Sequence, residues 1–110
     1  MFSEGFRLRG FRSDDLNRVM EINFECLPEN YSTHFYRDLY QRFPETFLVA
    51  EADGHVQGYI MCRVERGLSK FSNIRPARLI HVVSIAVREP YRHRGIASGL
   101  LLEAMRNGRS

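Results

Sequence analysis

Hydrophobic and polar positions divide the first quarter of the chain into one strand and one helix. Apolar and basic residues alternate from Phe6 to Phe11, and this period of two predicts a strand with one buried face. From Leu16 to Leu27 apolar residues recur at intervals of three and four, which predicts an amphipathic helix. Ser13 stands where a helix N-cap is expected, and Pro28 would end the helix.

A second helix and a hairpin are predicted next. An apolar stripe favours a helix over residues 31–43, which Pro44 would stop. Residues 46–51 are rich in strand formers, and the following Asp53-Gly54 pair is typical of a tight hairpin turn. Alternation then predicts the returning strand over residues 55–65.

The last part of the pattern predicts a loop, a strand and a helix. Residues 67–77 show no periodicity and are expected to form a loop. Residues 78–87 end in a nearly continuous apolar run, which is typical of a central strand buried on both faces. Gly108 is expected to cap the final helix. That helix would place on the core Ile96, Leu100, Leu101, Ala104 and Met105.

The junction between this strand and this helix has the composition of an anion site. A helix N-terminus carries unpaired N–H groups and about half a positive charge, so it attracts phosphate. Arg92 and Arg94 would add full charges there, and Gly95 would let a phosphate approach the backbone closely. The expected ligand is a phosphorylated cofactor.

Three segments together resemble one known family. The order Arg-x-x-Gly-x-Ala at Arg92, Gly95 and Ala97, behind an apolar strand, resembles the acetyl-CoA signature of the GNAT acyltransferases. Residues 27–31 and 81–87 are similar to the catalytic subunits of protein N-terminal acetyltransferases of the archaeal, NatA and RimI-like type. The resemblance implies transfer of an acetyl group from acetyl-CoA to the α-amino group of protein N-termini by direct attack.

The resemblance also implies a fold. It is the α+β GNAT fold, a three-layer α/β/α arrangement around a mixed sheet, here as a single domain over residues 1–110. The C-terminal strands and helix of the family, with a cofactor-binding Asn and a leaving-group Tyr, have no counterpart in the sequence. By resemblance the cofactor-binding residues are Ile85, Ala86, Val87, Arg92, His93, Arg94, Gly95, Ile96, Ala97 and Ser98. The backbone at Ile85 and Val87 would pair with pantetheine amides.

Two residues are candidates for handling the amine proton. An α-amino group has a pKa near ~8, well below that of lysine at ~10.4, so a modest base suffices to keep it neutral. His81 at the strand entrance and Glu29 in the turn that resembles the peptide entrance could supply that base. A hydrogen-bonded structural histidine and a solvated loop glutamate remain the alternatives. Substrate contacts are expected from Leu27, Pro28, Glu29 and Tyr31.

Composition narrows the function classes. The chain has 110 residues, 44% of them hydrophobic, and a formal net charge of +3, which does not by itself require nucleic acid. Cys26 and Cys62 lie in apolar stretches without metal-ligand spacing, so no metal and no disulfide are expected. No apolar run approaches the ~20 residues of a membrane span, and a cytoplasmic location is expected.

The expected partners follow from these readings. They are a protein or peptide N-terminus as substrate, an auxiliary subunit or the ribosome, and a second copy of the chain, with neither a membrane nor a specific nucleic acid. Two alternatives to the N-terminal acetyltransferase stay open. One is a non-catalytic acyl-CoA-binding or interaction module, and the other is an acetyltransferase acting on a small-molecule amine.

Overall fold

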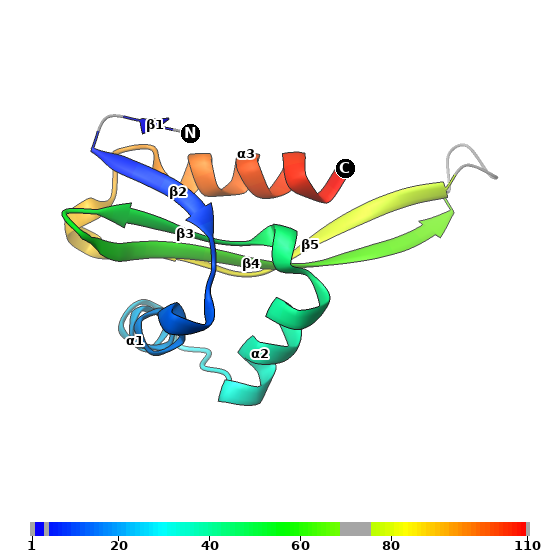
Figure 1. The fold of residues 1–110 in the computed structure, drawn as a ribbon, viewed down its shortest axis with the longest axis horizontal. Coiled ribbons are helices and arrows are strands. Elements are labelled where there is room, and N and C mark those ends of the chain that lie inside the picture. Colours follow the sequence, from blue (N-terminus) through cyan, green and yellow to red (C-terminus); the bar gives the residue numbers. More distant parts are fainter. Residues whose placement is uncertain (1, 4, 69–75, 110) are drawn as a thin grey trace.

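The computed structural model describes residues 2–3, 5–68 and 76–109, which form one sheet with helices on both faces (Figure 1). Its strands are β1 (Phe2–Ser3), β2 (Phe6–Gly10), β3 (Phe47–Ala52), β4 (His55–Leu68) and β5 (Pro76–Val87). Its helices are α1 (Leu16–Cys26), α2 (Thr33–Arg42) and α3 (Ile96–Arg109), with short 3₁₀ turns η1 (Ser13–Asp15), η2 (Pro44–Thr46) and η3 (Glu89–Tyr91). Among the helices of these residues, none combines the length and the apolar character that crossing a membrane requires.

The strands follow one another across the sheet in chain order, and every described pairing is antiparallel. Helices α1 and α2 cover one face and α3 covers the other, so the expected three-layer α+β architecture is confirmed (Figure 1). The parallel pairing that a mixed sheet requires is absent from residues 2–3, 5–68 and 76–109. Each connection between neighbouring strands in these residues joins an antiparallel pair.

Each face of the sheet has its own core. The first core joins α1 and α2 to the sheet through Val19, Ile22, Tyr36, Leu39, Phe47, Val49, Tyr59 and Met61. The second joins α3 to the sheet through Phe6, Leu48, Ala50, Ile60, Cys62, Val87, Ile96, Leu100 and Ala104. Apolar side chains of β3 and β4 alternate between the two cores, as the period-two pattern of a strand requires.

The start of α1 differs from the prediction. Ser13 does not cap the helix; it begins the 3₁₀ turn η1, and the buried Asp15 accepts a hydrogen bond from the Arg12 backbone N–H at 2.8 Å. Arg9 donates to both carboxylate oxygens of Asp15, at 2.8 and 2.9 Å. Burial raises the pKa of Asp15, but these hydrogen bonds outweigh it and the pKa lies below its usual value.

The last helix also differs at its end. Gly108 lies inside α3 and is buried, so it is not the predicted cap. Ile96, Leu100, Ala104 and Gly108 form a buried stripe at four-residue spacing, whereas Leu101, predicted to face the core, is 38% exposed. A Cβ at Gly108 would lie 2.6 Å from Ile80 Cδ1 and 2.9 Å from Ile80 Cγ1, so a larger residue there would require the Ile80 side chain to shift.

Strands β4 and β5 form a hairpin longer than predicted. The expected loop over residues 67–77 is too wide, because Gly67 pairs with Ala77 and Leu68 with Pro76. The rest of that predicted loop, residues 69–75, lies outside the described residues.

Strand β5 is not the strand buried on both faces that its apolar run predicts. It ends the strand order of the described sheet, and Leu79 and Val82 are 61% and 37% exposed. The register shifts between the pairs Met61↔Ser84 and Cys62↔Val82, which leaves Val83 as an extra residue, a β-bulge. Among the described residues the apolar run therefore lies on an edge strand with a bulge, and not on a central strand.

Candidate active site

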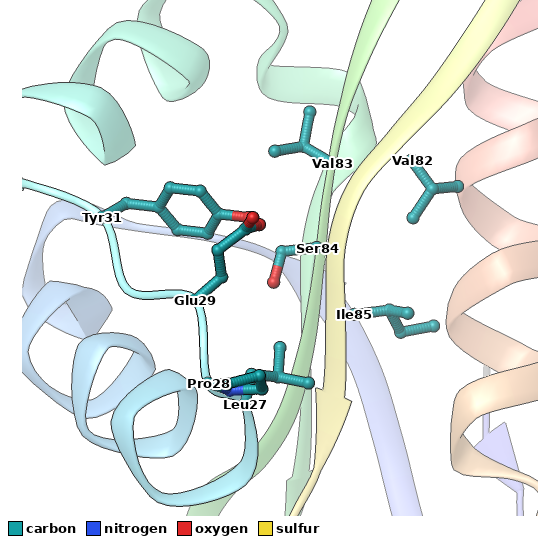
Figure 2. A pocket seen from close by; sticks show the side chains of 8 residues that line it. All are labelled: Leu27, Pro28, Glu29, Tyr31, Val82, Val83, Ser84 and Ile85. Carbon is teal, nitrogen blue, oxygen red and sulfur yellow. The ribbon is translucent and has the colours of Figure 1, made fainter.

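Three hollows follow one another along β5 and onto the start of α3. The first, of about 650 Å³, is lined by Leu27, Pro28, Glu29, Tyr31, Val82, Val83, Ser84 and Ile85 (Figure 2). The second, of about 260 Å³, is lined by Cys26, Leu27, Ile85, Ala86, Val87, Arg92 and Ala97. The third, of about 190 Å³, is lined by Val87, Tyr91, Arg92, His93, Gly95, Ile96, Ala97 and Ser98. Neighbouring hollows share lining residues and so lie side by side, and the three together are termed the path.

The first hollow lies between β5 and the turn that joins α1 to α2. Pro28 follows the end of α1, and the next residues turn Glu29 and Tyr31 toward the strand (Figure 2). The Tyr31 hydroxyl donates to Glu29 Oε1 at 3.0 Å, and its ring stacks on Phe35 with centroids 4.7 Å apart. Burial and the neighbouring Glu29 carboxylate raise the pKa of Tyr31, so its hydroxyl stays protonated. All four predicted substrate-binding residues thus line one cavity.

A chain of buried polar side chains begins at the wall of this hollow. Ser84 Oγ lies 2.7 Å from the hydroxyl of Tyr59, whose side chain is fully buried. Asn23 Nδ2 donates to that hydroxyl at 3.0 Å, and Asn30 Nδ2 donates to Asn23 Oδ1 at 2.8 Å. None of these four residues is among the site residues that the sequence indicates. The one signal in the sequence is Ser84, a single polar residue within the apolar run of residues 82–87.

Two residues that line the second hollow contact the end of β5. Arg92 Nε donates to the Val87 carbonyl at 2.7 Å, and Cys26 Sγ lies 3.8 Å from the same oxygen. A carbonyl oxygen has two lone pairs, which these two donors occupy, so the Val87 carbonyl is engaged within the protein. The predicted cofactor residues Ile85, Ala86 and Val87 line this hollow.

The third hollow lies at the N-terminus of α3. The Gly99 N–H donates to the Gly95 carbonyl at 2.9 Å as the helix begins, and the N–H groups of the first turn precede this bond. Gly95 has φ +86°, and a Cβ there would meet nothing within 4 Å. Gly95 is therefore required for its backbone conformation, and the space beside it is open to a ligand.

Two predicted cofactor residues differ in their placement. His93 lines the third hollow and has φ +65°, a left-handed conformation. Arg94 lines none of the three hollows. Its guanidinium lies over the Tyr91 ring, 5.0 Å from the centroid, while the Tyr91 hydroxyl donates to Asp53 Oδ2 at 2.7 Å. Arg94 thus packs against Tyr91 of η3. Of the two predicted cofactor arginines, Arg92 is the one that lines the hollows.

A polar clamp joins α1 to the strand ends beside the second hollow. Arg88, the residue after β5, contacts Glu25 of α1 at 3.2 Å through Nε. Its Nη1 donates at 3.0 Å to Gln57 Oε1, which also accepts from Arg18 Nη2 at 3.0 Å. Gln57 is buried and its amide donates to the Ala52 carbonyl. These contacts connect α1 to the end of β5 beside the second hollow.

The candidate base His81 lies outside the three hollows. It is exposed on β5, opposite Arg63 of β4, and it immediately precedes Val82, the first residue of the strand that lines the first hollow. Glu29, the other candidate, lines the first hollow directly (Figure 2). Among the described residues no group of three or more histidine, cysteine, aspartate or glutamate side chains could hold a metal ion.

The sequence matches a family model over residues 16–110, and that model describes the acetyltransferase (GNAT) family. The chain belongs to the GNAT family.

Curated relatives of this GNAT chain carry the name N-alpha-acetyltransferase. The protein from Saccharolobus solfataricus is 44% identical over 106 residues, which are 93% of this chain and 62% of that protein. The protein from Sulfurisphaera tokodaii is 42% identical over 105 residues, 92% of this chain and 61% of that protein. The chain therefore spans about three fifths of the length of these relatives.

A solved structure shows the same arrangement. Arabidopsis thaliana Naa50, in complex with the bisubstrate analogue CoA-Ac-MVNAL, superposes with a TM-score of 0.75 at 26% identity. The match covers 93% of this GNAT chain and 63% of that one.

Proposed function

We propose that this GNAT chain forms the peptide entrance and cofactor site of an enzyme that transfers an acetyl group from acetyl-CoA to the α-amino group of protein N-termini. The path of three adjoining hollows along β5 carries this proposal. It runs from the turn between α1 and α2, where a peptide N-terminus would enter, to the N-terminus of α3, where the cofactor phosphates would bind. The names of the curated relatives support the same reaction.

The residues of the path fit the cofactor in chemical terms. The first turn of α3 offers backbone N–H groups to a pyrophosphate, and Arg92 adds a guanidinium at the point shared by the second and third hollows. Ile85, Ala86 and Val87 form an apolar wall for a pantetheine arm. When bound, acetyl-CoA supplies a thioester whose C–S bond breaks as the amine nitrogen bonds to the acetyl carbon.

The chain's own groups would prepare the amine. An α-amino group is about 10% neutral at pH 7, which is far more than a lysine, so binding and orientation matter more than a strong base. Glu29, held by the Tyr31 hydroxyl, is placed to accept a hydrogen bond or the proton from an amine entering the first hollow. His81 would accept the proton only through water, given its position outside the hollow. An auxiliary subunit or the ribosome as a further partner stays a prediction.

Acetylation of defined peptides tests the proposal. The full-length protein should acetylate a peptide with a free N-terminus, and mass spectrometry should place the acetyl group on the α-nitrogen. The control peptide has the same sequence with a blocked N-terminus and one internal lysine, and it should stay unmodified. Acetylation of the lysine alone, or of neither peptide while a small amine is consumed, would contradict the proposal.

A further inference from the structure

The four polar side chains behind the first hollow have a fixed hydrogen-bond direction. Asn30 Nδ2 lies 3.4 Å from the backbone carbonyl oxygens of both Asn23 and Leu27. Backbone carbonyls can only accept hydrogen bonds, so the Asn30 atom facing them must be its NH₂ group. That group also faces the Asn23 side chain at 2.8 Å, which must therefore present its oxygen.

The same order of donor and acceptor continues from Asn23 to Ser84 at the wall of the first hollow. With its oxygen turned to Asn30, Asn23 presents its NH₂ group to the Tyr59 hydroxyl at 3.0 Å, and the phenol oxygen accepts. The phenol has one proton, and Ser84 Oγ at 2.7 Å is its remaining partner in the described part of the chain. A fully buried phenol that left this proton unpaired would be destabilised, so Tyr59 donates to Ser84.

Ser84 is then left with its own proton. Its oxygen accepts from Tyr59, and within residues 2–3, 5–68 and 76–109 the Ser84 hydroxyl has no second hydrogen-bond partner. Ser84 is only 6% exposed and lines the first hollow, on the side of β5 that faces Glu29 and Tyr31 (Figure 2). A buried polar hydrogen aimed at a cavity favours a ligand atom that accepts it.

We propose that Ser84 is a substrate-binding residue that donates a hydrogen bond to the first peptide carbonyl oxygen of the acetyl acceptor. This inference rests on the proposed function, because it assumes that the acceptor enters beside Glu29. The acceptor atom is a carbonyl oxygen, since the neutral amine must keep its lone pair for attack on the thioester. Tyr59 and the two asparagines act as positioning residues that orient the Ser84 hydroxyl.

Peptide binding to the full-length protein, measured by calorimetry in the presence of CoA, tests the contact. Two peptides are compared, one natural and one with an (E)-alkene in place of its first peptide bond, which removes the carbonyl oxygen. Ser84→Ala should weaken binding of the natural peptide about 2- to 12-fold, the range of one neutral hydrogen bond, and should leave the affinity for the alkene peptide unchanged.

Two further variants distinguish a direct hydrogen bond from Ser84 to the peptide from a purely structural role of this residue. Ser84→Thr keeps a hydroxyl and should restore selectivity for the carbonyl. Tyr59→Phe removes the phenol donor while keeping Ser84, and should weaken the natural peptide less than Ser84→Ala does. CoA affinity, measured separately, should be the same in all of them.

Several results would overturn the assignment. Equal losses for both peptides in Ser84→Ala would mean that the residue is only structural. A loss of acetyl-CoA affinity instead of peptide affinity would move the contact to the thioester carbonyl. Because binding is measured without turnover, a protein that binds with this selectivity but acetylates neither peptide would contradict the proposed function and still support the role of Ser84.

Discussion

Replacing Gly95 with alanine should separate the two roles that glycine has at the start of α3. At φ +86° an L-residue is strained by about 1–2 kcal/mol, and the loss of chain entropy in the unfolded state offsets about 0.4–1 kcal/mol of that. The net loss of stability is then about 1 kcal/mol. Because nothing lies within 4 Å of the new Cβ, no steric clash within the protein adds to it.

The second effect concerns the ligand. The new methyl group would stand in the third hollow, which Gly95 lines, and would keep a pyrophosphate from the N–H groups of the first turn. If two such contacts of about 1 kcal/mol each are lost, affinity for acetyl-CoA falls about 30-fold. At a hundred times the wild-type Kd, the ligand stabilises wild type by about 2.7 kcal/mol and the variant by about 0.9 kcal/mol.

Gly54→Ala is the matched control. Gly54 has φ +79° in the β3–β4 hairpin, it also has nothing within 4 Å of its Cβ position, and it lines none of the three hollows. Thermal unfolding with and without acetyl-CoA should show similar melting temperatures for the two variants alone, but full protection by the ligand only in Gly54→Ala. Equal protection of both variants would refute the placement of the phosphates at α3.

Other expectations can be checked with the same preparations. Glu29→Gln and His81→Ala should each lower the rate of peptide acetylation by a factor of about 10² to 10⁴ if these residues accept the amine proton, and acetyl-CoA affinity should not change. Full activity of both variants across pH 6 to 9 would exclude the two residues as bases. Gly108→Ala should destabilise by up to about 2 kcal/mol in urea unfolding, because its Cβ would lie 2.6 Å from the partly buried Ile80 side chain and the overpacking cost of about 1–3 kcal/mol exceeds the gain in helix propensity of about 1 kcal/mol; Gly99→Ala in the same helix, with a nearest contact of 3.4 Å, should stabilise by up to about 1 kcal/mol. Equal effects of the two would contradict the packing described for α3. Light scattering should show self-association of the 110-residue chain, reduced by Leu102→Glu, because that leucine is 64% exposed; a monomeric wild-type chain would contradict this.

Most helices, strands and turns follow from short sequence patterns, because residues close together in the chain determine where these elements begin and end. The Asp53-Gly54 turn forms where expected, with φ +55° and +79°, since few residues other than glycine, asparagine and aspartate adopt these angles. The end of α1 before Pro28 is equally local, because proline cannot continue a helix. The segments that line the path, at residues 27–31 and 85–98, were also identified from sequence.

The sequence predictions differ from the structure where contacts between residues far apart in the chain determine the packing. Gly108 was expected to be a cap because glycine is common after helices, yet its close approach to Ile80 depends on how α3 packs against β5. The polar chain from Asn30 to Ser84 spans α1, β4 and β5, so no spacing in the sequence indicates it. The edge position of β5 likewise depends on strand order and not on its apolar run.

The extra residue Val83 changes which side chains can act together. In a regular strand, residues three apart point to opposite faces, so His81 and Ser84 would be separated by the sheet. The bulge inverts the alternation between them: Val82 points toward α3, and Val83 and Ser84 point toward α1 and α2 (Figure 2). His81, next to Val82, then shares the face of Ser84 and Glu29. Without this valine His81 and Ser84 would be two residues apart in a regular strand and would still share a face, so the bulge keeps the candidate base and the hydroxyl together while adding Val83 to the wall of the first hollow.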